Sequence, residues 1–188
     1  MTTILVVDNG GQFTHLEGRA LRDLGVETGT VENDAPPEEL AEADGLVLSG
    51  GPDSASAEAA GGRCEEYLDL GVPVLGICLG MQLVADALGG DTAPGDYGGY
   101  ADVTVEIVAP EDPLVGSLAP ETRVWTSHAD EVIEVPPGFS RTAGSDVCAI
   151  EAMSDPQRGL YGVQWHPEVA HTERGEEVFE NFRAICEG

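Results

Sequence analysis

The chain has 188 residues, with 35 acidic side chains against 8 basic ones, and every basic one is an arginine. The formal net charge of −27 excludes ordinary binding of nucleic-acid backbones by the free surface and argues against binding to anionic membranes. No stretch approaches the roughly 18 apolar residues of a membrane span. The N-terminus lacks the basic start and long apolar core of a signal peptide, so we expect a cytoplasmic protein.

The first half of the chain alternates between strand and helix patterns. Short apolar runs predict strands, and longer runs with helical spacing predict helices between them: strands at 4–7, 26–31, 45–48 and 72–77, and helices at 14–24, 57–70 and 79–88. This rhythm predicts an α/β fold, flavodoxin-like, with a mainly parallel twisted sheet and helices on both faces. Ligands of such sheets bind outside the carboxyl ends of the strands, where residues 8–12, 49–52 and Cys78 would meet.

The second half changes rhythm. Strand patterns follow one another with few helices between them, at 102–108, 123–126, 131–135, 147–153 and 159–163, before a final helix at 172–185. We therefore expect a short mixed or antiparallel extension of the sheet and a single domain over residues 1–188. Acidic residues are spread along the whole chain, and a hydrophobic content of 41% argues against disorder. We interpret the acidity as adaptation to high salt, which screens carboxylate repulsion.

Cys78 has the most informative surroundings. It lies between Gly76 and Gly80, where a buried strand turns directly into a helix. This is the layout of a nucleophile elbow with cysteine in place of serine, and a helix start favours the reactive thiolate. Free cysteines are often inert core residues, and we keep that interpretation for Cys64, Cys148 and Cys186. The four cysteines lack metal-ligand spacing, so no metal is expected.

A cysteine nucleophile needs a base and a group that orients the base. His166 follows a predicted strand, and Glu168 stands two residues further on, with a proline between them. From the residues alone, an ordinary structural histidine remains equally open. An acyl-transfer site also needs an oxyanion hole, for which the backbone N–H groups of Gly51 and Leu79 are candidates. A plain glycine turn is the alternative at residues 49–52.

Three motifs together resemble the class I (triad) glutamine amidotransferases. They are Gly-Ile-Cys-Leu-Gly-Met-Gln at 76–82, Ser-Gly-Gly-Pro at 49–52 and His-Pro-Glu at 166–168, and the resemblance covers nearly the whole chain. It implies that Cys78 attacks the side-chain amide of L-glutamine, that His166 protonates the leaving ammonia and later activates water, and that Glu168 orients His166. It also implies glutamine-binding contacts from Gly51, Gln82, Ser127, His128 and Ala129.

Further stretches at 7–15, 125–132 and 167–172 resemble the glutaminases of GMP synthetases, especially archaeal ones. Trp165 and Ala129 stand where that family often has Phe and Gly. The chain has no P-loop pattern and no room for an ATP-pyrophosphatase module. The resemblance therefore implies that this chain holds no cofactor. It also implies a separate ATP-pyrophosphatase (synthetase) subunit that binds ATP, Mg²⁺ and xanthosine monophosphate (XMP) and receives ammonia.

Three alternatives stay open at this point: the glutaminase subunit of another amidotransferase, a stand-alone hydrolase of γ-glutamyl compounds, and a non-catalytic relative with the same fold. The glycine-rich segment 95–100 is either a mobile cover or docking element for the partner, or an ordinary loop.

Overall fold

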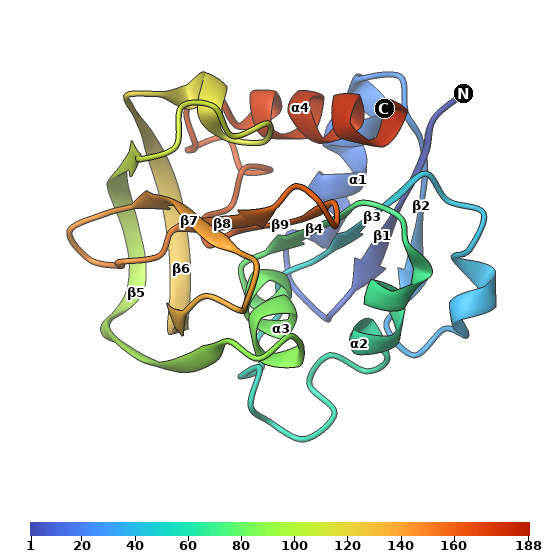
Figure 1. The fold of residues 1–188 in the computed structure, drawn as a ribbon, viewed down its shortest axis with the longest axis horizontal. Coiled ribbons are helices and arrows are strands. Elements are labelled where there is room, and N and C mark those ends of the chain that lie inside the picture. The colour runs from blue at the N-terminus through green and yellow to red at the C-terminus, as the bar shows by residue number, and fades with distance from the viewer.

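In a computed structural model of the protein, strands from both halves of the chain form a single sheet (Figure 1). The structure describes residues 1–96 and 102–188 in full and only the backbone course of 97–101, so the predicted cover segment at 95–100 lies largely outside the described residues. The nine strands follow the order β2-β1-β3-β4-β9-β8-β7-β5-β6. Their bounds are β1 Thr3–Asp8, β2 Glu27–Glu32, β3 Gly45–Leu48, β4 Val74–Ile77, β5 Asp91–Ile107, β6 Glu121–Glu134, β7 Ser140–Gly144, β8 Ala152–Asp155 and β9 Leu160–Val163.

The sheet has a parallel half and an antiparallel half. Strands β2, β1, β3, β4 and β9 pair in parallel, and β8, β7, β5 and β6 continue the sheet in antiparallel pairs. The parallel part has the order typical of doubly wound flavodoxin-like sheets. Every residue of β3, β4 and β9 is buried, as expected for central parallel strands covered on both faces. The predicted fold class is confirmed.

Helices cover both faces of this sheet. Figure 1 shows α1 (Thr14–Asp23) and α4 (Gly175–Glu187) on one face and α2 (Cys64–Tyr67) and α3 (Leu79–Ala87) on the other. Short 3₁₀ turns occupy Pro37–Glu39, Leu68–Leu70 and Gly116–Leu118. The apolar stripe of α4 packs into one core cluster, and the buried face of α3 packs into the other. No helix in the described part of the chain is long and apolar enough to cross a membrane.

One predicted helix is much shorter than expected. The pattern at 57–70 predicted a single long helix, but only Cys64–Tyr67 is α-helical, and turns precede it. The cause is local, since Ala59 and Gly62 both adopt positive φ angles, of 61° and 54°. Such angles interrupt a right-handed helix, and the two adjacent glycines at 61–62 disfavour its continuation.

The second half departs from the sequence prediction at several places. The strand predicted at 147–153 begins five residues later, as β8 at Ala152, because the Ser145 hydroxyl accepts the backbone N–H groups of Val147 and Cys148 and closes a turn there. Strand β7 was missed. The two strands predicted at 123–126 and 131–135 are one continuous strand, β6, because pairing with β5 overrides the polar residues between them.

The C-terminal helix begins three residues later than the expected 172, at Gly175. Arg174 before it is left-handed, with φ 56°, and the side chain of Thr172 is held by the His166 carbonyl. The residues between His166 and Arg174 therefore form a turn that fixes the loop after β9, and the helix starts only after them.

Candidate functional site

Cys78 forms a sharp elbow between β4 and α3. Its φ and ψ are 54° and −110°, a conformation that non-glycine residues rarely adopt and that concentrates at functional sites. Its backbone N–H bonds the carbonyl of Val163 on β9 across 2.9 Å, which fixes the elbow to the sheet. A Cβ on Gly76 would stand 2.5 Å from the carbonyl carbon of Gly80, so both glycines permit this close approach of strand and helix.

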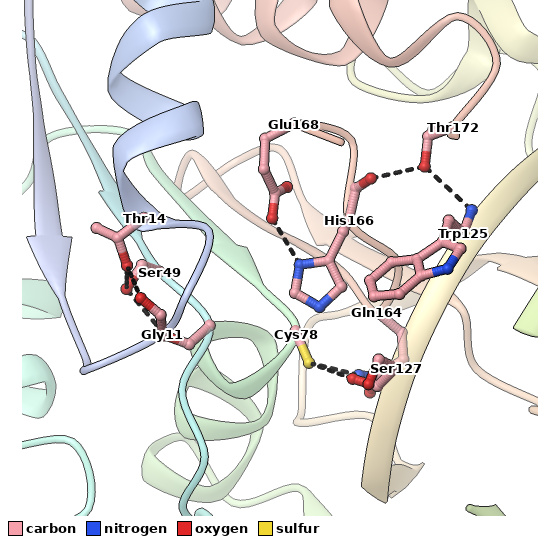
Figure 2. Close-up of polar contacts among 11 residues, drawn as sticks. Gly11, Thr14, Ser49, Cys78, Trp125, Ser127, Gln164, His166, Glu168 and Thr172 are labelled. Carbon is pink, nitrogen blue, oxygen red and sulfur yellow. Dashed lines mark hydrogen bonds and ion pairs between the residues drawn. The ribbon is translucent and has the colours of Figure 1, made fainter. Parts of the chain in front are cut away.

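His166 and Glu168 lie directly after β9, beside that elbow. The Nδ1 atom of His166 stands 2.6 Å from Oε1 of Glu168, and both side chains are buried. Figure 2 shows the imidazole ring between Glu168 and Cys78, with Cys78 on the side of its other nitrogen. Burial alone would lower the pKa of His166, but its contacts with Cys78 and Glu168 raise that pKa to about 10. His166 is therefore an imidazolium at neutral pH.

The imidazole of His166 is held on several sides. Phe13 and Trp125 lie with their ring centroids 5.5 and 5.6 Å from it, the first edge-on. The backbone N–H of His166 bonds the carbonyl of Trp125 across 3.1 Å. Thr172 accepts the backbone N–H of Trp125 and donates to the carbonyl of His166, so it links β6 to the loop after β9 (Figure 2).

The sulfur of Cys78 has two further polar neighbours. Ser127 carbonyl oxygen and Gln164 Nε2 each stand 3.5 Å from it, Gln164 as donor (Figure 2). The other three cysteines are different, because burial raises the pKa of Cys64 and of Cys186 to about 12 and raises that of Cys148 further. Buried thiols of that kind are inert, as expected from the sequence.

A cavity of about 450 Å³ opens over Cys78. It is lined by residues 10–14 and Glu17 after β1, by 50–52 after β3, by Cys78 after β4, by 127–129 of β6, and by His166 and Glu168 after β9. The three segments expected to meet at the carboxyl ends of parallel strands do meet there, which confirms that prediction. The volume of the cavity lies within the range of roughly 300–1,000 Å³ typical of small-molecule sites.

The structure brings some predicted binding residues to this cavity and not others. Gly51, Ser127, His128 and Ala129 line it. Gln82 does not line it, because its amide is buried behind the elbow, where Nε2 donates to the carbonyl of Asp130 across 2.8 Å. In this structure Gln82 therefore supports the 127–130 segment rather than the cavity wall.

Of the two oxyanion candidates, Gly51 lines the cavity and Leu79 does not. Leu79 is the first residue of α3, where backbone N–H groups have no partner inside the helix. Its side chain packs over Gly51, at which an added Cβ would stand 2.9 Å from Leu79 Cδ2. The turn at 49–51 is held by the Ser49 hydroxyl, which accepts the N–H of Asn9 and donates to the carbonyl of Gly50.

Sequence reasoning missed several residues that shape the site. Phe13 and Trp125 enclose His166, Gln164 contacts the sulfur, and Glu17 lines the cavity with a side chain that is 1% exposed. Glu17 lies three residues after Thr14, which is about one helical turn. This spacing was the sequence signal that both residues lie on the same side of α1. The burial of an acidic side chain at that point depends on the loops that pack over the helix.

Comparison with known proteins agrees with this geometry. The family model described as "Glutamine amidotransferase class-I" matches residues 5–185. The chain is 70% identical to the A subunit of the glutamine-hydrolyzing GMP synthase of Natronomonas pharaonis over all of both chains. It is 68% identical to the same subunit from Haloarcula marismortui, over 100% of this chain and 96% of the relative. A crystal structure from Thermoplasma acidophilum, provisionally assigned as a GMP synthase A subunit, superposes with a TM-score of 0.93 at 40% identity, covering 100% of this chain and 94% of the other.

The chain therefore belongs to the class-I glutamine amidotransferase family. Within that family, its high-identity relatives over the full length are the A subunits of archaeal GMP synthases.

Proposed function

We propose that this chain is the glutaminase subunit of a GMP synthase, and that it hydrolyses L-glutamine and supplies ammonia to a separate ATP-pyrophosphatase subunit. The observation that carries the proposal is the Cys78 elbow beside the His166–Glu168 pair, whose facing atoms are 2.6 Å apart. Identity of 66–70% over the whole chain with the A subunits of GMP synthases from halophilic archaea supports the choice of acceptor.

The chemistry follows from the charges in the site. An imidazolium beside the sulfur favours the thiolate, which attacks the side-chain carbonyl carbon of glutamine. The carbonyl oxygen gains the negative charge, and the backbone N–H groups of Gly51 and Leu79 would stabilise it. His166 then gives its proton to the departing nitrogen. The carbon–nitrogen bond breaks, and ammonia and a γ-glutamyl thioester on Cys78 remain.

Hydrolysis of the thioester returns the site to its starting state. His166, now neutral, takes a proton from a water molecule, and the hydroxide attacks the thioester carbon. The carbon–sulfur bond breaks, glutamate leaves, and the thiolate and imidazolium are restored. Glu168 holds Nδ1 of the ring throughout, so the other nitrogen faces the sulfur and stabilisation of the imidazolium is retained.

The partner and the setting of this reaction are part of the same proposal. The partner is an ATP-pyrophosphatase subunit that carries ATP and Mg²⁺ and converts XMP to GMP, and the two chains form a heterodimer in a cytoplasm of high salt. The support is that the relatives are named as one subunit of a synthase, together with the net charge of −27.

The proposal is tested by reconstitution with a candidate synthetase subunit in high salt. We expect GMP formation from XMP, ATP and glutamine with the wild-type chain. With Cys78→Ser, glutamine should no longer support the reaction, whereas added ammonium still should, because the synthetase does not need the thiol. Glutamine hydrolysis or γ-glutamyl peptide hydrolysis at full rate without any synthetase effect would instead support a stand-alone hydrolase.

A further inference from the structure

Glu17 is a buried acid that the steps above leave without a role. It lies on α1, its side chain is 1% exposed, and it lines the same cavity as Cys78, His166 and Glu168. Carboxyl groups are almost never fully buried unless they are paired or hydrogen-bonded. The arrangement therefore calls for a partner that keeps this group in place.

Two carboxyl oxygens at this cavity have no hydrogen-bond partner within the described part of the chain. One is Oε2 of Glu17 and the other is Oε2 of Glu168, whose Oε1 is bound to His166. The charged groups near enough to act on Glu17 are Glu168 and His166 from the loop after β9 and Cys78 from the elbow, and the backbone amide of Gly50 hydrogen-bonds to the Glu17 carboxyl. Glu17 is thus bonded to the turn at 49–51 and lies within reach of the charge of Glu168.

We propose that Glu17 is a positioning residue for Glu168: it keeps a proton, donates it to the free oxygen of Glu168, and accepts the backbone amide of Gly50. A single shared proton would satisfy both orphan oxygens at once. Two carboxyl groups in one dry site cannot both ionise without strong repulsion, so one of them holds the proton. His166 hydrogen-bonds to Glu168 and not to Glu17, so the partner that carries the shared proton is Glu17.

The electrostatics of the site agree with this assignment. Burial and the nearby charge of Glu168 raise the pKa of Glu17 well above its ordinary value, and Cys78 adds to the rise. His166 and the Gly50 amide act in the opposite direction and do not cancel it. A carboxyl–carboxylate hydrogen bond is charge-assisted and stronger than a neutral one, so it would hold the Glu168 side chain in the orientation that His166 needs.

This role would connect two parts of the proposed machinery that come from distant stretches of sequence. Through Glu168 it acts on the base His166, and through Gly50 it acts on the turn that carries the Gly51 oxyanion donor. Its kinetic consequence rests on the proposed glutaminase function, whereas the protonation state of Glu17 does not.

Two variants and a control test it. Glu17→Gln keeps a donor for Glu168 and an acceptor for Gly50 but cannot ionise, and Glu17→Met fills similar space with neither. We expect Glu17→Met to lower kcat of the reconstituted glutaminase by about 10- to 100-fold with little change in KM, the scale of losing a partner that orients an active group. Glu17→Gln should lose less, and its kcat should no longer fall at alkaline pH through ionisation of this group. The matched control Asp23→Asn removes an exposed acid of the same helix and should match wild type.

An infrared measurement separates this inference from the proposed function. The Glu151→Gln chain in high salt, without partner or substrate, should show the carbonyl band of a protonated carboxyl at neutral pH, and that band should disappear when Glu17→Gln is added; the Glu151→Gln background removes the band that Glu151, with its pKa of about 7, would add. A wild-type kcat in Glu17→Met, or a Glu151→Gln chain without the band, would overturn the inference. A band that behaves as expected in a chain with no glutaminase activity would instead contradict the proposed function and leave the shared proton intact.

Discussion

The hydroxyl of Thr172 donates to the backbone carbonyl of His166 across 2.6 Å. The same oxygen accepts the backbone N–H of Trp125 across 3.0 Å, so one buried side chain connects the loop after β9 to the middle of β6. His166 and the 127–129 segment of the cavity wall are thereby placed by a contact between parts of the chain that lie more than forty residues apart.

Removing this hydroxyl should weaken both the fold and the site. In Thr172→Val, the His166 carbonyl and the Trp125 N–H lose their partner, which costs about 1–3 kcal/mol of unfolding free energy. We also expect a lower kcat, since the base is less well placed. Thr172→Ser keeps the hydroxyl and serves as the control in denaturant unfolding and glutaminase assays. Equal losses in the serine and valine variants would contradict a role for the hydrogen bonds.

Glu168 should set the charge of His166. Because its carboxylate faces Nδ1 at 2.6 Å, Glu168→Gln is expected to lower the His166 pKa from about 10 toward its ordinary value. The histidine signals in an NMR pH titration measure this directly. The folded pKa is raised, so the stabilisation from protonated His166 is complete below about 6.5 and is lost as pH rises toward 10. Glu168→Gln should therefore destabilise the chain at pH 7 more than at pH 10, and kcat should fall by about 10²- to 10⁴-fold. An unchanged titration would show that Glu168 does not hold the proton on this ring.

Glu151 should make stability fall as pH rises from about 4.5 to about 7. Burial, together with the charge of Glu131, raises its pKa to about 7 against the opposing Ser145 hydrogen bond. Between pH 4.5 and 7 the native state thus keeps a proton that the unfolded chain has already released. We expect Glu151→Gln to be more stable than wild type at pH 8, by up to about 3 kcal/mol, and to show no such gain at pH 4.

The control for that experiment is Asp146→Asn, which removes an exposed acid from the same turn. Melting curves of the three proteins at both pH values give the comparison. A gain of the same size at pH 4 and pH 8 would show that the effect is one of packing and not of titration.

Salt should stabilise the protein strongly. Among the described residues, Arg19, Arg63, Arg123, Arg158, Arg174 and Arg183 each lie within 4.0 Å of a carboxylate, so most of the few cations are already locally neutralised. The remaining acidic excess repels itself over a Debye length that shrinks from about 10 Å at 0.1 M salt to about 3 Å at 1 M. We expect Tm to rise from low to multimolar KCl and to rise less in a neutral osmolyte of equal osmolality. A Tm that is flat or falls with salt would contradict adaptation to high salt.

The elements that could be predicted are those with strong local signals. The apolar runs of β1, β3 and β4, the helix that follows Cys78 and the glycines around it are visible in the sequence, because a buried strand and a tight turn require those residue types. The helix predicted at 57–70 is shortened by positive φ angles, and the strand predicted at 147–153 begins only at Ala152 because of the Ser145 turn. Neither interaction leaves a periodic pattern.

The sequence by itself determined the elbow at Cys78 and the candidate nucleophile, base and acid, since a glycine-flanked turn and a His-Pro-Glu segment are local and chemically specific. Only the tertiary structure decided what surrounds them. It placed Gln82 behind the elbow, enclosed His166 between Phe13 and Trp125, and buried Glu17 within reach of the charge of Glu168. These relations depend on which loops meet at the carboxyl edge of the sheet. That is set by packing between segments far apart in the chain, for which a single sequence has no local signal.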